Sequence, residues 1–249
     1  MICSAKSESG HGGRRKDVRY QHRPRDLPGL RHLRKRTLMP KVGDEPQPTV
    51  VVIDDDADVR EALDGLLRSV GLRVELLSST KHYFERPQPT GPECLVLDIR
   101  LPGQSGLDFH AELVKAGIQV PVIFISGHAD VPISVRAMKA GAIEFLTKPV
   151  RHQDLLDAIQ QAINRDIARR KRESAIAQLR SIYENLTARE REVMSLVVAG
   201  EANRVIASEF GISEATVKLH RGQVMRKMNA KSLVELVRMA DMLQLHRNT

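Results

Sequence analysis

The chain has 249 residues and contains only two cysteines, Cys3 and Cys94. Two cysteines exclude a disulfide framework, and Cys94 lies in an apolar run where a buried free thiol is expected. No stretch approaches the roughly 18 to 20 apolar residues that a membrane-spanning helix needs. The N-terminus also lacks the apolar core of a signal peptide. We therefore expect a soluble, cytoplasmic protein in a reducing compartment, with no membrane partner.

The formal net charge of +8 is unevenly distributed along the chain. Residues 1–47 hold 12 Lys and Arg against 5 Asp and Glu, residues 48–165 hold 12 against 16, and residues 166–249 hold 15 against 10. The first segment has no apolar periodicity, which predicts a disordered basic tail over 1–47. Met39, shortly before the first apolar run, is a plausible alternative start. Beyond the tail, an acidic region precedes a basic one, and a basic region is the kind that binds nucleic acid.

From residue 48 onward, short apolar runs alternate with helical stretches. This alternation predicts a doubly wound α/β domain over 48–165, with a five-stranded parallel sheet. We place the strands at 49–53, 73–77, 94–97, 121–125 and 143–146, and the helices at 57–69, 80–86, 106–116, 132–140 and 152–165. Residues 166–185 have a helical composition without a wide apolar face and predict a helical linker. Residues 186–249 predict an all-α domain of several short helices.

Charged and polar residues follow four of the predicted strands. Asp54 and Asp55 follow the first strand, Asp98 the third, Ser126 the fourth and Lys148 the fifth. Because ligands of an open parallel sheet bind beyond the carboxyl ends of its strands, we expect these side chains to converge there. Carboxylate oxygens are ligands for a hard cation, whereas a hydroxyl and an ammonium group donate to an anion. The set therefore predicts a site that combines a cation with an anionic group.

The acidic run is open to three other interpretations. Asp56 and Asp58 fit a helix start, since Asp favours the N-cap and the first turn. Alternatively, Asp54 and Asp56 form the D-x-D pattern that follows an apolar strand in haloacid-dehalogenase-like phosphatases. That alternative leaves Asp98 without a role, and the region is too short for a cap domain. A nucleotide-binding Rossmann unit is disfavoured because the first turn has no glycines.

Residues 49 to about 165 resemble the flavodoxin-like receiver domain of two-component response regulators. The motifs "TVVVIDDD", "LVLDIRLPGQSG", "VIFISGH" and "FLTKPV" carry the resemblance, with spacings of 43 residues from Asp55 to Asp98 and 50 from Asp98 to Lys148. The resemblance implies that Asp98 is the phosphoacceptor and that a phosphohistidine of a sensor histidine kinase is the donor. It also implies a Mg²⁺ site made by Asp55, Asp98 and the Arg100 carbonyl, with Asp54 holding a metal-bound water.

The same resemblance assigns three residues to the phosphorylated state. Ser126 and Lys148 would contact the phosphoryl oxygens, and Phe145 would be the aromatic residue that rotates toward the site. It further implies a cis peptide bond between Lys148 and Pro149.

The last third of the chain has the pattern of a helix-turn-helix domain. Its capping and turn residues are Thr187 with Glu190, Gly200, Asn203, Gly211 and Ser213. In the third helix, placing Val217 inward leaves Ala215, Leu219 and Gly222 outward beside Lys218. A solvated face rarely favours such apolar and small residues, whereas a helix that reads a DNA groove can use them.

Residues 183–245 resemble the LuxR-type helix-turn-helix of NarL/FixJ response regulators, through "LTARERE", "VVAGEANRVIA", "GISEATVKLHRGQVMRKM" and "AKSLVELV". The resemblance implies a DNA-binding segment that comprises Thr216, Val217, Lys218, Leu219, Arg221, Gly222 and Lys227. Lys218, Leu219 and Gly222 would read bases, whereas Thr216, Arg221 and Lys227 would contact phosphates. It also implies a dimer helix with Leu233, Leu236, Val237 and Ala240. Gly222 and Arg204 depart from the residues common at these positions.

Together these patterns predict a transcriptional response regulator and not an enzyme. Phosphorylation would favour a homodimer that binds double-stranded promoter DNA, with RNA polymerase as a further partner. A LuxR-type regulator that works without phosphorylation is the alternative within the family.

Overall fold

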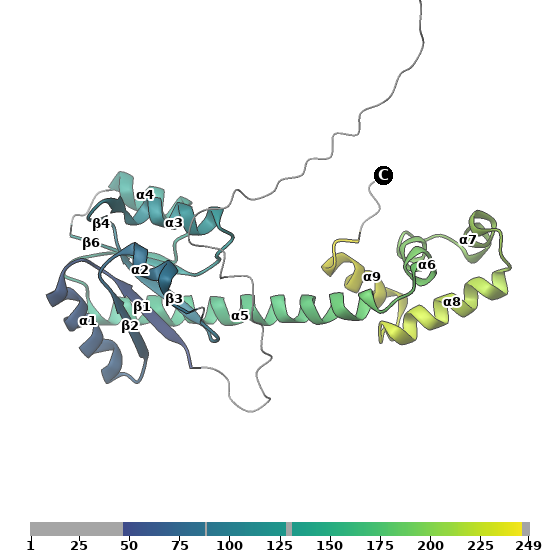
Figure 1. Cartoon of the computed structure of the whole chain (residues 1–249), viewed down its shortest axis with the longest axis horizontal. Coiled ribbons are helices and arrows are strands. Elements are labelled where there is room, and N and C mark those ends of the chain that lie inside the picture. Colours follow the sequence, from purple (N-terminus) through teal and green to yellow (C-terminus); the bar gives the residue numbers. More distant parts are fainter. Residues whose placement is uncertain (1–46, 88, 128–130, 246–249) are drawn as a thin grey trace, which may run out of the picture. The chain divides into compact units, whose positions relative to one another are not determined.

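The computed structural model describes residues 47–87, 89–127 and 131–245 (Figure 1). The predicted disordered tail over 1–47 lies, apart from Gln47, outside the described residues. Among the helices of the described ranges, none is both long enough and apolar enough to cross a bilayer.

A five-stranded parallel sheet forms the centre of the first domain. Its strands are β1 (Thr49–Ile53), β2 (Arg73–Leu77), β3 (Glu93–Asp98), β6 (Val122–Ser126) and β7 (Glu144–Thr147), in the order β2-β1-β3-β6-β7. Successive strands are connected through α1 (Ala57–Ser69), α2 (Thr80–Glu85), α3 (Gly106–Lys115) and α4 (Val131–Lys139). The last strand is followed by α5 (His152–Glu184), whose first part belongs to this domain. The predicted α/β class and sheet are confirmed, with strand ends within one residue of the prediction.

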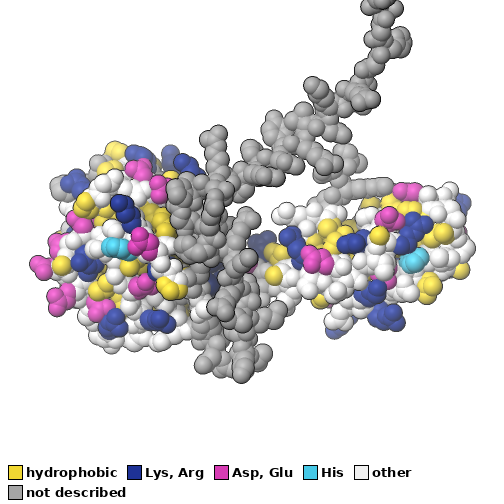
Figure 2. Space-filling view, in the orientation of Figure 1, with side chains coloured by type: hydrophobic (Ala, Val, Ile, Leu, Met, Phe, Trp, Pro, Cys, Tyr) yellow, Lys and Arg dark blue, Asp and Glu magenta, His cyan; other side chains and the backbone are white. Residues whose placement is uncertain are grey.

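Helices cover both faces of the sheet (Figure 1). Because successive strand residues point to opposite faces, Val50 and Val52 pack with α1 and α5, whereas Val51 and Ile53 pack with α2, α3 and α4. A strand buried on both faces must be apolar throughout, which explains the run "VVVI". On the face of this domain that Figure 2 shows, acidic and basic side chains are interspersed with apolar ones.

A short antiparallel hairpin follows β3 and was not predicted. It pairs β4 (Arg100–Leu101) with β5 (Gln104–Ser105), and Gly103 in its turn has a φ of 82°. Strands of two residues are too short to show a periodicity in the sequence. The hairpin leads directly into α3, so the residues after Asp98 are held in a defined path.

The predicted helix over 152–165 and the predicted linker over 166–185 form one continuous helix, α5, of 33 residues. Its first half buries Leu155, Ile159 and Ile163 against the sheet. Near its end, Leu179 belongs to the core of the second domain.

The second domain is all-α, as predicted, and consists of α6 (Ala188–Val198), α7 (Asn203–Phe210), α8 (Glu214–Lys227) and α9 (Leu233–Met242). The capping box at Thr187 and Glu190 is present, Ser213 caps α8, and Gly211 has a φ of 63°. One prediction was wrong: Asn203 does not cap α7, because the N-cap is Ala202. The Asn203 side chain instead accepts a hydrogen bond from Arg221 at 2.7 Å.

Candidate functional site

Three aspartates meet where β1 and β3 end. Asp54 and Asp98 are buried, with 0% and 6% exposure, and Asp55 is exposed. Each offers a carboxylate oxygen, and these oxygens lie within 4.8 Å of one another. β1 and β3 are neighbouring parallel strands in register from Thr49 to Ile53, which explains why residues that are 43 positions apart come together.

Lys148 joins the aspartates from the loop after β7. Its Nζ donates to Asp54 Oδ2 at 2.7 Å and to Asp98 Oδ2 at 3.0 Å. Burial alone lowers the pKa of Lys148, but its hydrogen bonds to the two aspartates outweigh burial and raise this pKa above the ordinary value. The peptide bond from Lys148 to Pro149 is cis, as predicted. An ammonium group therefore partly balances the two buried carboxylates.

Asp54 is held by the start of α1. Its Oδ1 accepts the backbone N–H of Asp56 at 3.0 Å, and its own carbonyl accepts a hydrogen bond from Arg60 at 2.7 Å. Burial raises the pKa of Asp54, and the bond from Lys148 acts in the opposite direction. The Asp56 side chain accepts from the N–H groups of Asp58 and Val59, so Asp56 is the helix cap that the simpler interpretation predicted. The phosphatase alternative needs the Asp56 side chain for catalysis, and its use as a helix cap therefore disfavours that alternative.

The other predicted site residues lie on the two following strands. Ser126 ends β6, is 3% exposed and pairs in register with Thr147, and its carbonyl accepts the Lys148 N–H at 2.7 Å. Phe145 on β7 is half-buried and packs against the core on the side of α2, α3 and α4. Arg100 begins the hairpin, and its N–H donates to Asp98 Oδ1 at 3.2 Å.

The donor set fits a hard divalent cation. The three clustered side chains are all carboxylates, which Mg²⁺ prefers, and none of them is a sulfur or imidazole ligand. Adjacent carboxylates repel one another, and a cation between them would remove that repulsion.

In the helical domain, the exposed face of α8 carries apolar, basic and small residues. Leu219 is 60% exposed, and Lys218 and Gly222 are exposed beside it. Thr216 lies in the first turn, where its N–H donates to Ser213. The prediction of Val217 as a DNA-binding residue is wrong, because Val217 is 0% exposed and belongs to the core of the domain.

Two other residues predicted to contact DNA also hold the domain together. Lys227 donates to Glu190 Oε2 at 2.7 Å, and Glu190 is 3% exposed. Arg221 binds Asn203 on α7. Sequence reasoning missed both contacts, because they join residues 37 and 18 positions apart.

The Glu190 carboxylate makes the stability of the helical domain pH-dependent. Burial alone raises its pKa, but the hydrogen bonds from Lys227 and Thr187 outweigh burial and lower this pKa below the ordinary value of 4.5. A lowered pKa gives stability that is complete above the unfolded-state value and is lost as the pH falls through the folded-state value. We expect Glu190→Gln to lower the free energy of unfolding by about 2 kcal/mol at neutral pH.

Calorimetry of the full chain between pH 7 and pH 3 tests this expectation. The difference between wild type and Glu190→Gln should shrink below about pH 4.5. Glu192→Gln is the matched control, since the Glu192 side chain pairs only with Arg189 among the described contacts and this pair is exposed. The substitution should cost about 0.5 kcal/mol or less. A difference that is independent of pH would contradict the assignment to the Glu190 carboxylate.

The prediction for the last helix is only partly supported by burial. Leu236 and Ala240 are each 1% exposed and pack in the core of their own domain, so as dimer contacts they were predicted wrongly. Leu233 is 43% exposed and Val237 is half-buried. Val234 and Met242, with 62% and 42% exposure, extend the accessible apolar surface of α9.

Two family models match separate parts of the chain. Residues 50–160 match the model of the response regulator receiver domain, and residues 184–240 match that of the bacterial regulatory proteins of the luxR family. Nodulation protein W of Bradyrhizobium diazoefficiens is 48% identical over 199 residues, which cover 80% of this chain and 88% of that protein. The transcriptional regulatory protein FixJ of Azorhizobium caulinodans is 42% identical over 191 residues, covering 77% and 90%. The low-resolution structure of response regulator StyR aligns with a TM-score of 0.68 and 45% identity, over 78% of this chain and 98% of that one.

Proposed function

The chain belongs to the response regulators that join a receiver domain to a LuxR-type DNA-binding domain, and we propose that Asp98 is its phosphoacceptor. It is a transcriptional response regulator, which is not the function of a classical enzyme. The single observation that carries the proposal is the meeting of Asp54, Asp55, Asp98 and Lys148 at one edge of the sheet.

The proposed chemistry is transfer of a phosphoryl group to a carboxylate. An Asp98 oxygen attacks phosphorus, the new O–P bond forms, and the bond from phosphorus to the imidazole nitrogen of a sensor histidine kinase breaks. Mg²⁺ held by Asp55, Asp98 and the Arg100 carbonyl, with Asp54 binding it through a water, would neutralise the phosphoryl charge. Lys148 is within hydrogen-bond distance of Asp98, which supports its proposed role as a donor to the phosphoryl oxygens of the product.

The added charge of roughly −1.5 to −2 supplies the driving force for a change of state. Ser126 lies at the end of the strand next to β3, where its hydroxyl can turn toward a phosphoryl oxygen. Phe145 packs on the side of the sheet that α2, α3 and α4 cover, and it would move into the space that opens when Ser126 turns toward the phosphoryl group.

In the proposed active state, the cytoplasmic protein dimerises and binds promoter DNA. A dimer brings a second reading helix close to the DNA and so raises its effective concentration. Lys218, Leu219 and Gly222 are exposed along α8 and would face the bases, with Thr216, Arg221 and Lys227 toward the phosphates. Leu233 and Val237 remain the proposed dimer contacts of α9. RNA polymerase is the proposed partner on DNA.

Sedimentation of the full chain tests the proposed activation. With acetyl phosphate and Mg²⁺, we expect a shift from monomer toward dimer together with tighter binding to a duplex that the wild-type protein selects from random sequence. Omission of Mg²⁺ should prevent both changes. A protein that takes up the phosphoryl group but changes neither its oligomeric state nor its DNA affinity would contradict the proposal.

Lys218→Ala should relax the base preference of the protein. A side chain that reads a base edge contributes about 1 to 3 kcal/mol of discrimination, whereas a phosphate contact contributes equally on every sequence. Lys231→Ala is the matched control, because Lys231 is exposed but lies outside α8. Selection from random duplexes measures the effect, and equal losses on all sequences would remove Lys218 from the base-reading residues.

A further inference from the structure

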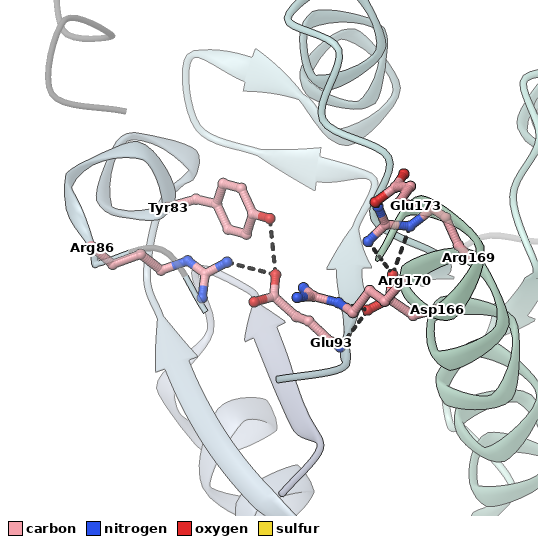
Figure 3. A network of polar contacts seen from close by, with 7 residues as sticks. All are labelled: Tyr83, Arg86, Glu93, Asp166, Arg169, Arg170 and Glu173. Carbon is pink, nitrogen blue, oxygen red and sulfur yellow. Dashed lines mark hydrogen bonds and ion pairs between the residues drawn. The ribbon is translucent and has the colours of Figure 1, made fainter. Parts of the chain in front are cut away.

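A buried polar cluster lies at the start of β3, the end opposite to Asp98 (Figure 3). Glu93 is the first residue of the strand and is 1% exposed. Its side chain accepts a hydrogen bond from the Tyr83 hydroxyl at 2.9 Å and pairs with Arg86 at 2.5 Å. The Arg86 guanidinium also lies 4.1 Å from the centre of the Tyr83 ring. Hydrogen bonds and an ion pair thus join the end of α2 to the start of β3.

Asp166 on α5 forms the second half of this cluster. It is 0% exposed, and its Oδ2 accepts the backbone N–H of Glu93 at 2.9 Å. Arg169 donates to Asp166 Oδ1 at 2.5 Å and 2.9 Å, and Arg170 donates to Oδ2 at 2.6 Å. Figure 3 shows Asp166 between the two arginines of its own helix and the backbone of Glu93.

Helix packing alone does not require a charge at this position. Leu155, Ile159 and Ile163 cover the sheet with apolar side chains, and Asp166 continues the same face of α5. A buried charge is costly, whereas an apolar residue of similar volume packs at least as well. What a carboxylate adds is a directional bond to one N–H group, which fixes the position of α5 along β3.

A second line of contacts reaches the same cluster from the phosphorylation site. Thr80, the first residue of α2, is buried and donates to the Gln104 side chain at 2.9 Å. Gln104 belongs to the hairpin that follows Asp98. Both β3 and α2 therefore connect the surroundings of Asp98 with Glu93, and Asp166 connects Glu93 with the helix that continues into the DNA-binding domain.

We propose that Asp166 is a positioning residue that couples the state of Asp98 to α5 through β3 and α2. This inference rests on the proposed function, since it requires DNA binding that responds to phosphorylation. The route is separate from Ser126 and Phe145, which lie on β6 and β7.

The test compares Asp166→Asn with wild type. Asparagine has nearly the same shape and keeps an acceptor for Glu93, but it loses the charge that holds Arg169 and Arg170. Asp157→Asn is the matched control, since Asp157 is exposed on the same helix and binds only the Gln153 side chain among the described contacts. For each variant we measure phosphoryl uptake from acetyl phosphate with Mg²⁺ and DNA affinity with and without the phosphodonor.

We expect Asp166→Asn to take up phosphate within about twofold of the wild-type rate, while its gain in DNA affinity on phosphorylation falls about tenfold. A purely structural role would lower the melting temperature without changing that gain. An unchanged gain in folded Asp166→Asn overturns the inference, whereas absence of a gain in wild type overturns the proposed function itself.

Arg170→Gln keeps the test decisive where Asp166→Asn does not fold. The Arg170 side chain is 31% exposed and makes one of the pairs to Asp166, so its loss leaves the carboxylate bound to Glu93 and Arg169. A partial loss of the phosphorylation-dependent gain supports the inference. A full wild-type gain in this variant contradicts it.

Discussion

Asp98→Asn will take up no phosphoryl group from acetyl phosphate in the presence of Mg²⁺, whereas wild type will take up one per chain. The amide nitrogen and oxygen of asparagine are not nucleophiles toward phosphorus, and one of the carboxylate ligands in the acidic cluster is lost as well. The fold should persist, since asparagine has nearly the same shape as aspartate. In the described structure Lys148 also pairs with Asp54, and that pair remains when Asp98 is replaced. Intact-mass measurement reads the result directly.

Asp108→Asn is the matched control for this substitution. Asp108 is exposed in the first turn of α3 and has no part in the cluster of carboxylates. It should be phosphorylated like wild type. A labelled Asp98→Asn protein would show that another residue accepts the phosphoryl group, and it would remove the basis of the proposed function.

Gly106→Ala will lower the free energy of unfolding of the receiver domain by about 2 to 3 kcal/mol, as expected for overpacking at a rigid site. A Cβ atom at Gly106 would overlap the carbonyl oxygen of Asp98 and would come within 3.2 Å of Ile99 Cα. Both neighbours are backbone atoms, so relief requires movement of the chain that carries the phosphoacceptor. We therefore expect slower phosphorylation along with the lower stability, measured by calorimetry and intact mass.

Gly222→Ala separates this steric effect from the general effect of replacing glycine. Among the described residues, no atom outside the adjoining backbone of α8 lies within 4 Å of a Cβ at Gly222, and the position is in the middle of α8. There alanine should stabilise the DNA-binding domain by up to about 1 kcal/mol, because glycine is a poor helix former. Equal stability changes at the two positions would contradict the steric account of Gly106.

Much of the receiver fold could be predicted from the sequence because its signals are local. A strand that is buried on both faces is apolar over its whole length, and the parallel arrangement brings the residues after each strand to one edge. This logic predicts that Asp54, Asp55, Asp98 and Lys148 lie together, and in the structure they do. The short hairpin after Asp98 escaped prediction, because two-residue strands carry no pattern and depend on contacts such as the one from Thr80 to Gln104.

Predictions for the DNA-binding domain failed where burial decides the role of a residue. Val217, Leu236 and Ala240 lie in stretches that the family resemblance associates with DNA or dimer contacts, yet each is at most 1% exposed. A resemblance assigns a role to a segment, whereas packing decides which side of the helix is accessible. Helical periodicity predicts that Val217 points inward, and for this residue it predicts the observed burial better than the family resemblance does.

The burial of Asp166 could be predicted from its spacing. It follows Leu155, Ile159 and Ile163 on the helical period, which predicts a buried position, and Arg169 and Arg170 stand three and four residues later. The interpretation of residues 166–185 as a linker hid this signal, because it placed the domain boundary just before Asp166. The partner, a backbone N–H 73 positions away, was visible only in the structure.

The most direct test of the central claim is to locate the phosphoryl group. Wild-type protein is incubated with acetyl phosphate and Mg²⁺, the acyl phosphate is trapped by borohydride reduction, and the peptides are analysed by mass spectrometry. The account predicts a single modified residue, Asp98, and no modification when Mg²⁺ is withheld. Modification of a different residue, or none in a folded protein supplied with Mg²⁺, would contradict it.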